Sequence, residues 1–528
     1  MRRFPIHLAV LFGSALLTGC TVGPDWKAPH MWAPTGWFGH TKASMQAGQA
    51  AHKEASEPVL APVDPKWWTI LHDAELTALE QRVTAANLNL RIASMRLAES
   101  RLQRRITGAD QYPTLQADGS YTGEKISSLG VIGILGGGSS GGSFASTAGS
   151  ANGLGGRSNG IPTAAAGVPS IPSFSLWQYG FDASWELDLW GRVRREVESA
   201  DANVAASADQ RRSSVLSVVA EVARDYVMLR GIQEQLRITQ ENIGTARQSL
   251  DLTQARFRGG LTTDLDVANA AAQLANTEAE VPQLEQSRDE QINALSFLLG
   301  EGPQALRAEL ITPQAIPPVP PAVPVGVPSE LARRRPDIRQ AEDQLHAATA
   351  EIGVAIGDFY PKFSIEASGG LQALKFTELA DWDAHQYGIG PTITLPIFEG
   401  GRLRATLQLR KSEQQEAALN YQQTVLQAWH DVDNALTAYA KEQHRRDALS
   451  VSVEQNRKAL DLSRQRYTQG VADFLNVLDS ERSLLAAELQ LAESTTTVSE
   501  NLVQLYKALG GGWETEFPTA SNTNAHRD

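Results

Sequence analysis

One cysteine, Cys20, stands in the surroundings that point most clearly to covalent chemistry in this 528-residue chain. The motif Leu17-Thr18-Gly19 precedes it, and an apolar stretch, residues 8–17, follows two arginines near the start. This order is typical of a bacterial lipoprotein signal, which is cleaved before the cysteine as the thiol is acylated. We therefore expect residues 1–19 to be a signal peptide and Cys20 to carry lipid. A buried cysteine in a soluble protein is the alternative.

The rest of the chain lacks the residue spacings of enzyme chemistry. Its ten histidines fall in no metal-binding spacing, and the glycine-rich residues 136–142 have no phosphate-loop lysine. One cysteine allows neither an intrachain disulfide nor a cysteine-based metal site. Loss of the signal peptide removes two of the 47 basic residues, which leaves 45 − 60 = −15 and disfavours nucleic acid. We expect no catalytic residues, no cofactor, no metal site and no nucleic-acid partner.

Alternating side chains predict strands with one apolar and one polar face. The pattern is clearest where Trp185 and Glu186 fall on opposite faces, as expected for lipid on one side of a strand and water on the other. A half-buried strand in a soluble sheet is the alternative interpretation. Four segments carry the pattern: residues 115–122, 177–189, 363–368 and 387–397.

The number of strands has a consequence for assembly. No segment after residue 19 has eighteen consecutive apolar residues, so we expect no transmembrane helix. Four strands are too few to close a barrel, because roughly eight is the smallest number with a filled interior. The chain must therefore complete its sheet with further copies of itself.

The second half of the chain repeats the first. A shift of 210 residues places Gly191–Gly300 on Gly401–Gly510 without a gap, and a shift of 248 places Tyr112-Pro113 on Tyr360-Pro361. The difference of 38 residues falls in the first copy, which carries a Gly/Ser-rich insertion at residues 129–172. Such self-similarity indicates an internal duplication.

Long helical patterns predict a helical hairpin in each copy. Between Arg402 and Leu509 there is no proline and a single glycine, Gly470. This predicts a helix of about 68 residues, a turn at the glycine and a second helix of about 38 residues. The first copy repeats this pattern in residues 192–258 and 262–299. A further helix is predicted for residues 73–110, and we expect it to stack end to end with residues 262–299 along the long helix.

These features divide the chain into six parts. The proline-rich residues 303–328 read as an extended, semi-rigid linker between the copies. The expected division is a signal peptide at 1–19, an extended segment at 20–72, the first repeat at 73–302, the linker at 303–328, the second repeat at 329–511 and a disordered tail at 512–528.

Several motifs together resemble one family. The chain is similar to the TolC-like outer-membrane factors, and most to the lipoproteins that serve RND-type efflux pumps. The motifs are Cys20-Thr21-Val22-Gly23-Pro24-Asp25-Trp26, Trp67-Trp68, Pro328-Ser329-Glu330-Leu331, Arg335-Pro336-Asp337-Ile338, Tyr360-Pro361 and Arg466-Tyr467 with Gly470. The resemblance implies an α+β membrane protein: a homotrimer with a twelve-stranded outer-membrane β-barrel continuous with a twelve-helix periplasmic coiled-coil tunnel.

The resemblance also implies an entrance at the hairpin turns. Relatives carry an acidic ring at the segment that includes Asn476 and Asp479, of which only Asp479 keeps the acid. A tyrosine matching Tyr467 holds their closed state by reaching a partner that matches Asp266, whereas an arginine used in relatives is Ala472 here. The turn residues implied to contact a periplasmic adaptor protein are Gly259, Gly260, Leu261, Gly470 and Val471.

The expected function is that of a passive outer-membrane duct. It would export small molecules delivered by an inner-membrane RND-type pump and its adaptor, anchored in outer-membrane lipid through Cys20 and extending into the periplasm. Because a duct receives its cargo from the pump, the choice of substrate belongs to those partners. A lipid-anchored periplasmic coiled-coil scaffold without transport is the alternative.

Overall fold

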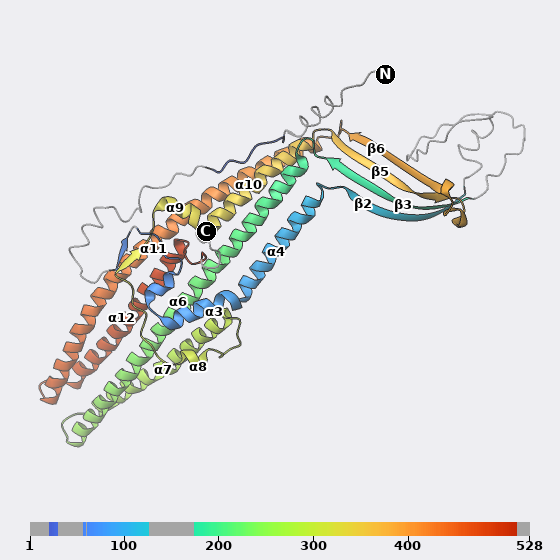
Figure 1. Cartoon of the computed structure of the whole chain (residues 1–528). Coiled ribbons are helices and arrows are strands. Elements are labelled where there is room, and N and C mark those ends of the chain that lie inside the picture. The colour runs from blue at the N-terminus through green and yellow to red at the C-terminus, as the bar shows by residue number, and fades with distance from the viewer. Residues whose placement is uncertain (1–20, 30–55, 60, 126–173, 515–528) are drawn as a thin grey trace, which may run out of the picture. The chain divides into compact units, whose positions relative to one another are not determined.

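The computed structural model describes residues 21–29, 56–59, 61–125 and 174–514 (Figure 1). Cys20, the signal peptide and the insertion at 129–172 lie outside these residues. The chain forms two compact units. The sheet unit is made from residues 108–194 and 357–400, and the helical unit from residues 22–107, 195–356 and the chain from 401 onward.

Four strands form one antiparallel sheet in the order β2-β3-β5-β6. Their bounds are Thr114–Glu124 for β2, Phe174–Leu187 for β3, Lys362–Ala373 for β5 and His385–Thr394 for β6. Two short 3₁₀ turns, Phe376–Glu378 and Trp382–Ala384, connect β5 to β6. All four predicted strands are present, although β6 ends three residues before the predicted Ile397.

The strand register separates polar from apolar side chains. Asp182 pairs with Gln116 on one side and Ser368 on the other, whereas the next residue back, Phe181, pairs with Ala117 and Gly369. Cross-strand partners point to the same face of a sheet, and successive residues point to opposite faces. The predicted alternation is therefore confirmed, with Trp185 on the apolar face and Glu186 on the polar face.

Two long helical hairpins dominate the helical unit (Figure 1). The first consists of α6, Arg192–Arg258, and α7, Asp264–Leu298; the second consists of α11, Arg402–Thr468, and α12, Phe474–Ala508. The long helix has 67 residues in both copies and the short one 35, as the repeat predicts. Among the described residues, none of these helices has the length of apolar sequence needed to cross a membrane.

The helix predicted for residues 73–110 is broken into two. It forms α3, Ala74–Ala86, and α4, Leu88–Ala109, because Asn87 adopts an extended backbone between them. The side-chain Nδ2 of Asn87 donates to the backbone carbonyl of Leu298 at 2.7 Å, and its Oδ1 accepts from the backbone amide of Leu90 at 3.1 Å. One side chain thus caps the end of α7 and the start of α4. Of the helix that was expected to stack end to end with residues 262–299, only the α4 part begins at the end of α7.

The second copy makes the same joint with a different residue. The short helix α9, Pro328–Arg334, leads through Arg335 into α10, Pro336–Gly357. Arg335 corresponds to Asn87 in the repeat, and it donates to the carbonyl of Ala508, at the end of α12, at 3.1 Å. Its guanidinium also bonds Asp337 and Asp431, so the buried charge is compensated.

The linker has more structure than its proline content predicts. It contains α8, Arg307–Leu310, and a strand, β4, Ala322–Pro324. Strand β4 pairs in parallel with β1, Glu57–Val59, from the segment that follows residue 20. The linker is therefore held against the helical unit by backbone hydrogen bonds and is no free spacer.

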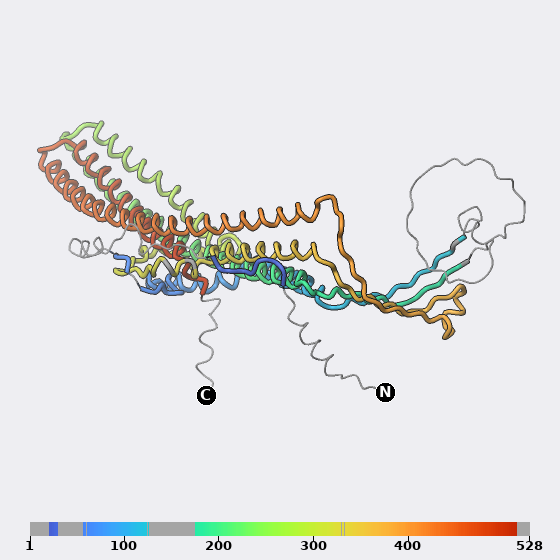
Figure 2. The backbone as a smooth tube through the Cα atoms, turned by 90° about the horizontal axis from the view of Figure 1, so that it is seen from above, coloured from blue at the N-terminus to red at the C-terminus, as the bar shows by residue number. Residues whose placement is uncertain are grey.

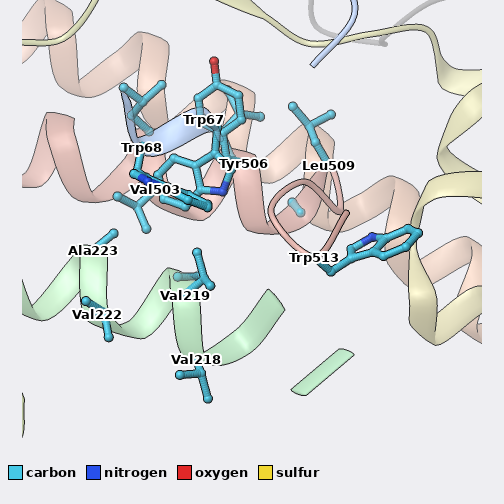
Figure 3. Packing of buried hydrophobic residues seen from close by; sticks show 14 of the residues in the cluster. Trp67, Trp68, Val218, Val219, Val222, Ala223, Val503, Tyr506, Leu509 and Trp513 are labelled. Carbon is cyan, nitrogen blue, oxygen red and sulfur yellow. The ribbon is translucent and has the colours of Figure 1, made fainter. Parts of the chain in front are cut away.

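The main core joins residues from both copies around an aromatic stack (Figure 3). Trp67, in the 3₁₀ helix Trp67–Leu71, stacks on Tyr506 of α12 with ring centroids 5.2 Å apart. Trp513 is buried in the same core, so the predicted disordered tail does not begin at residue 512. Gly510 and Gly512 take positive φ, and this glycine turn brings the chain back to the core.

A charged cluster surrounds Trp513. The guanidiniums of Arg212 and Arg339 lie 5.4 and 5.7 Å from its ring centroid, and both bond the buried Asp209. Asp343, which shares a hydrogen bond with Asp209, belongs to the same cluster. Burial, reinforced by the negative charges of Asp209 and Glu342, raises the pKa of Asp343 to about 6 despite Arg339.

Asp343→Asn is expected to stabilise the protein at neutral pH but not in acid. The pKa of Asp343 is higher in the folded than in the unfolded chain, so its protonation favours folding at low pH and this contribution disappears as pH rises through about 6. After discounting for solvent screening, we expect a gain of about 1 kcal/mol at pH 7.5 and no change at pH 4. Urea unfolding of the detergent-solubilised protein at both pH values measures it. An equal effect at the two values would contradict the assignment.

Candidate functional site at the two hairpin turns

The two hairpin turns have the same backbone conformation. Gly260 and Gly470 both take positive φ. The backbone amide of the next residue donates a hydrogen bond of 2.9 Å to a carbonyl near the helix end: Leu261 to Arg256 in the first turn and Val471 to Arg466 in the second. This is the arrangement in which a left-handed glycine ends a helix. Figures 1 and 2 both show the turns at the same end of the helical unit.

The turns expose apolar side chains at matching positions. Leu261 is 70% exposed and Leu265 67%, and their repeat partners Val471 and Leu475 are each 65% exposed. Turns of soluble hairpins usually present polar residues to water. Four exposed aliphatic side chains therefore lie at the two turns, at one end of the helical unit.

Asp266 stabilises the start of α7. It accepts hydrogen bonds from the amide and hydroxyl of Thr263, at 3.3 and 3.1 Å, and a short one from the hydroxyl of Thr262. Together with Thr263 it forms a capping box. Partial burial raises the pKa of Asp266, but these hydrogen bonds outweigh burial and hold the pKa below its usual value.

Tyr467 does not make the predicted hydrogen bond to Asp266. Its side chain is only 3% exposed, and its hydroxyl has no hydrogen-bond partner among the described residues. The ring instead packs at 5.5 Å from the ring of Phe474 and lies under the guanidinium of Arg256 at 4.6 Å. In this structure the capping box engages Asp266, and the ring of Tyr467 contacts Phe474 and Arg256; the bond expected in the closed state stays a prediction.

The other two predicted entrance residues lie on α12 close to its start. Asn476 and Asp479 are exposed and three positions apart, so they share one side of the helix. Asp473 is the N-cap residue of α12, as Thr263 is of α7. The carboxylate of Asp479 is therefore exposed to solvent at this end of the unit.

Sequence reasoning missed a set of polar contacts between the hairpins. Glu481 of α12 is buried, accepts from Ser249 of α6 and pairs with Arg464 of α11 at 2.9 Å. Similar contacts join Arg482 to Gln273 at 2.7 Å and Asn242 to Glu488 at 3.0 Å. These contacts could have been suspected from polar residues at helix positions where the apolar stripe would otherwise continue.

The sequence profile of a known family, described as outer membrane efflux protein, matches residues 79–301 and 327–511. The match covers more than half of the chain and includes both repeats and both turns. The chain belongs to the outer membrane efflux protein family.

Individual relatives are similar over nearly the full length. The chain is 31% identical over 521 residues to the pyoverdine export outer membrane protein OpmQ of Pseudomonas putida, covering 98% of this chain and 99% of that protein. It is 30% identical over 514 residues to the antibiotic efflux pump outer membrane protein ArpC of Pseudomonas putida, covering 97% and 96%. Among solved structures, the outer-membrane channel OprN superposes with a TM-score of 0.79 at 30% identity, covering 94% of this chain and 100% of that one.

These comparisons confirm the fold class and the broad function. The efflux protein has the trimeric outer-membrane channel architecture, with a helical tunnel, that its resemblance to the family implies. It is an outer-membrane component of an efflux system and extends from the outer membrane into the periplasm. The family is one of channels and not of enzymes.

Tyr467→Phe is expected to leave the protein as stable as the wild type or more stable. The substitution removes a buried hydroxyl without a partner and keeps the ring, so the free energy of unfolding should rise by up to about 1 kcal/mol. Urea unfolding followed by circular dichroism measures the change. A loss above about 1 kcal/mol would mean that the hydroxyl does have a partner.

Proposed function

We propose that this efflux protein is a passive trimeric duct that receives small molecules from an inner-membrane RND-type pump through a periplasmic adaptor. The observation that carries the proposal is an amphipathic four-stranded sheet with two open edges. Within the described residues, β2 and β6 each pair with a single strand. Three chains with four strands each supply twelve, enough for a barrel with an aqueous interior.

Unpartnered apolar faces on the helices support the same assembly. On α4 the side chains of Leu88, Ile92, Met95, Leu102 and Ile106 are exposed at the three- and four-residue spacing of a coiled-coil seam. On α11 an exposed stripe contains Leu409, Leu419 and Leu426. Neighbouring protomers would bury these faces and continue the wall of a tunnel.

The hairpin turns are the proposed contact for the adaptor. The predicted contact residues are Gly259, Gly260 and Leu261 of the first turn and Gly470 and Val471 of the second; Leu261 and Val471 are among the exposed aliphatic side chains. An adaptor whose own tip presents aliphatic groups would remove this surface from water, which stabilises association in proportion to the apolar area buried.

Single-channel recording from the purified protein in planar bilayers tests the proposal against the scaffold alternative. A duct gives stepwise conductance, and its barrel gives a trimer whose electrophoretic mobility changes on heating. A coiled-coil scaffold gives neither result, because it has no aqueous path through lipid. Absence of both from correctly targeted protein would overturn the proposal.

Cys20→Ser is expected to abolish lipid attachment. Thr21 follows the cysteine, so the mature lipoprotein would be sent to the outer membrane, where each buried methylene contributes about 0.8 kcal/mol to anchoring. Incorporation of labelled palmitate into wild-type protein and its loss in the variant measure this. If the wild type took up no label, Cys20 would not be the anchor.

Asp479→Ala is expected to weaken the preference for cations. Three copies of an exposed carboxylate around a narrow entrance attract cations, and multivalent ions most strongly. We expect a smaller reversal potential in a salt gradient and weaker block by trivalent metal ions. Asp264→Ala is the matched control, because it removes an exposed acid from the first turn of α7. Equal effects of the two variants, or none, would remove Asp479 from the entrance.

A further inference from the structure

Arg256 makes a contact between the two hairpins that no resemblance predicts. It lies in the last turn of α6, in the first hairpin. Its guanidinium carbon is 4.6 Å from the centroid of the Tyr467 ring, and its Nη1 donates to the carbonyl of Thr468 at 3.1 Å. Tyr467 and Thr468 are the last two residues of α11, in the second hairpin.

The contact uses three properties of arginine at once. The flat guanidinium lies over an aromatic face, it donates to a carbonyl that the end of α11 leaves without a helical partner, and its charge opposes the negative end of the helix dipole. Its Nε has no hydrogen-bond partner among the described residues. The ring and the carbonyl of the opposite hairpin are therefore its principal partners.

The duplication provides an internal comparison, because the equivalent contact is missing from the other copy. Arg466 occupies the repeat position of Arg256 on a turn with the same backbone, yet its side chain is exposed. Phe257 occupies the repeat position of Tyr467 and is 44% exposed, whereas Tyr467 is almost fully buried. The arginine of the first turn therefore contacts the second hairpin, whereas the equivalent arginine of the second turn does not contact the first within the described residues. The shape of the turn does not itself require the contact.

We propose that Arg256 is a clamp that holds the two hairpin turns of one protomer together when the periplasmic entrance is closed. The proposal rests on the channel function proposed above and assigns the residue that restrains its entrance. Opening then requires the guanidinium to leave the face of Tyr467 and the carbonyl of Thr468. In this structure Tyr467 is joined to the first hairpin through Arg256 and not through Asp266.

The size of the effect follows from the number of clamps. A cation on an aromatic face that water reaches favours the bound state by roughly fivefold. If the three protomers open together, three such clamps shift the ratio of closed to open trimers by about a hundredfold. Loss of Arg256 should therefore turn a rarely open entrance into one that opens often.

Thiol labelling tests the clamp without relying on conduction. Ala270 of α7 is buried against residues of the second hairpin, Tyr467 and Phe474 among them, so a cysteine there is protected while the hairpins stay together. The chain has one other cysteine, the expected lipid site. In an Ala270→Cys background we compare Arg256→Ala, Arg256→Lys and Tyr467→Leu with the matched control Arg466→Ala, and measure the rate of maleimide labelling of purified trimers.

The expected result is labelling that is faster by up to about a hundredfold in Arg256→Ala and Tyr467→Leu and the parental rate in Arg466→Ala. Arg256→Lys should fall between them, because lysine keeps the charge but loses the flat stack. If Arg256→Ala yields no trimer, the Arg256→Lys variant still tests the clamp. Equal labelling in the Arg256 and Arg466 variants would overturn the clamp.

Conductance separates failure of the clamp from failure of the channel proposal. A wild-type protein that conducts, with an open fraction unchanged by Arg256→Ala, would overturn the clamp and leave the duct intact. A protein that never conducts would overturn the duct, while the labelling rates would still decide whether Arg256 joins the hairpins. An open fraction raised in Arg256→Ala and not in Arg466→Ala supports both.

Discussion

The helical unit depends on how one helix can end where another begins. An α-helix leaves carbonyls unpaired at its last turn and amides unpaired at its first, and burying such ends without partners is costly. Asn87 solves this with one short amide that serves both ends, and Arg335 solves it in the second copy with a buried guanidinium and two aspartates. Because the hydrogen bonds at each joint are satisfied, two short helices can follow one another beside one long helix.

Features that rest on a pattern repeated along the chain could be predicted from the sequence. Features that depend on a single residue could not. The duplication, the 67-residue helices and the alternating strand faces each rest on many residues that agree with one another. The break at Asn87 rests on one residue with a modest helix penalty, which a run of good helix formers conceals. The pairing of β4 with β1 was hidden for a similar reason, because a short parallel pair between distant segments leaves no periodic signal.

The site shows the same division between backbone and side-chain chemistry. Glycines at 260 and 470 announce the two turns, because only glycine accepts positive φ without strain. The partners of Asp266 and Tyr467 could not be read in the same way. Asp266 had a local partner three residues away in the capping box, and this nearby bond competes with any distant one. After duplication the two turns kept one shape and acquired different chemistry.

The aromatic stack at the centre of the core has a consequence for how the protein is made. Trp67 lies near the beginning of the described chain, while its stacking partner Tyr506 and the neighbouring Trp513 come more than 400 residues later. An exported polypeptide enters the periplasm progressively, so the apolar faces prepared by the early helices must wait in water until α12 arrives. During that interval the nascent chain presents the sticky surfaces that promote aggregation. The rate at which the chain is secreted is therefore part of its folding problem.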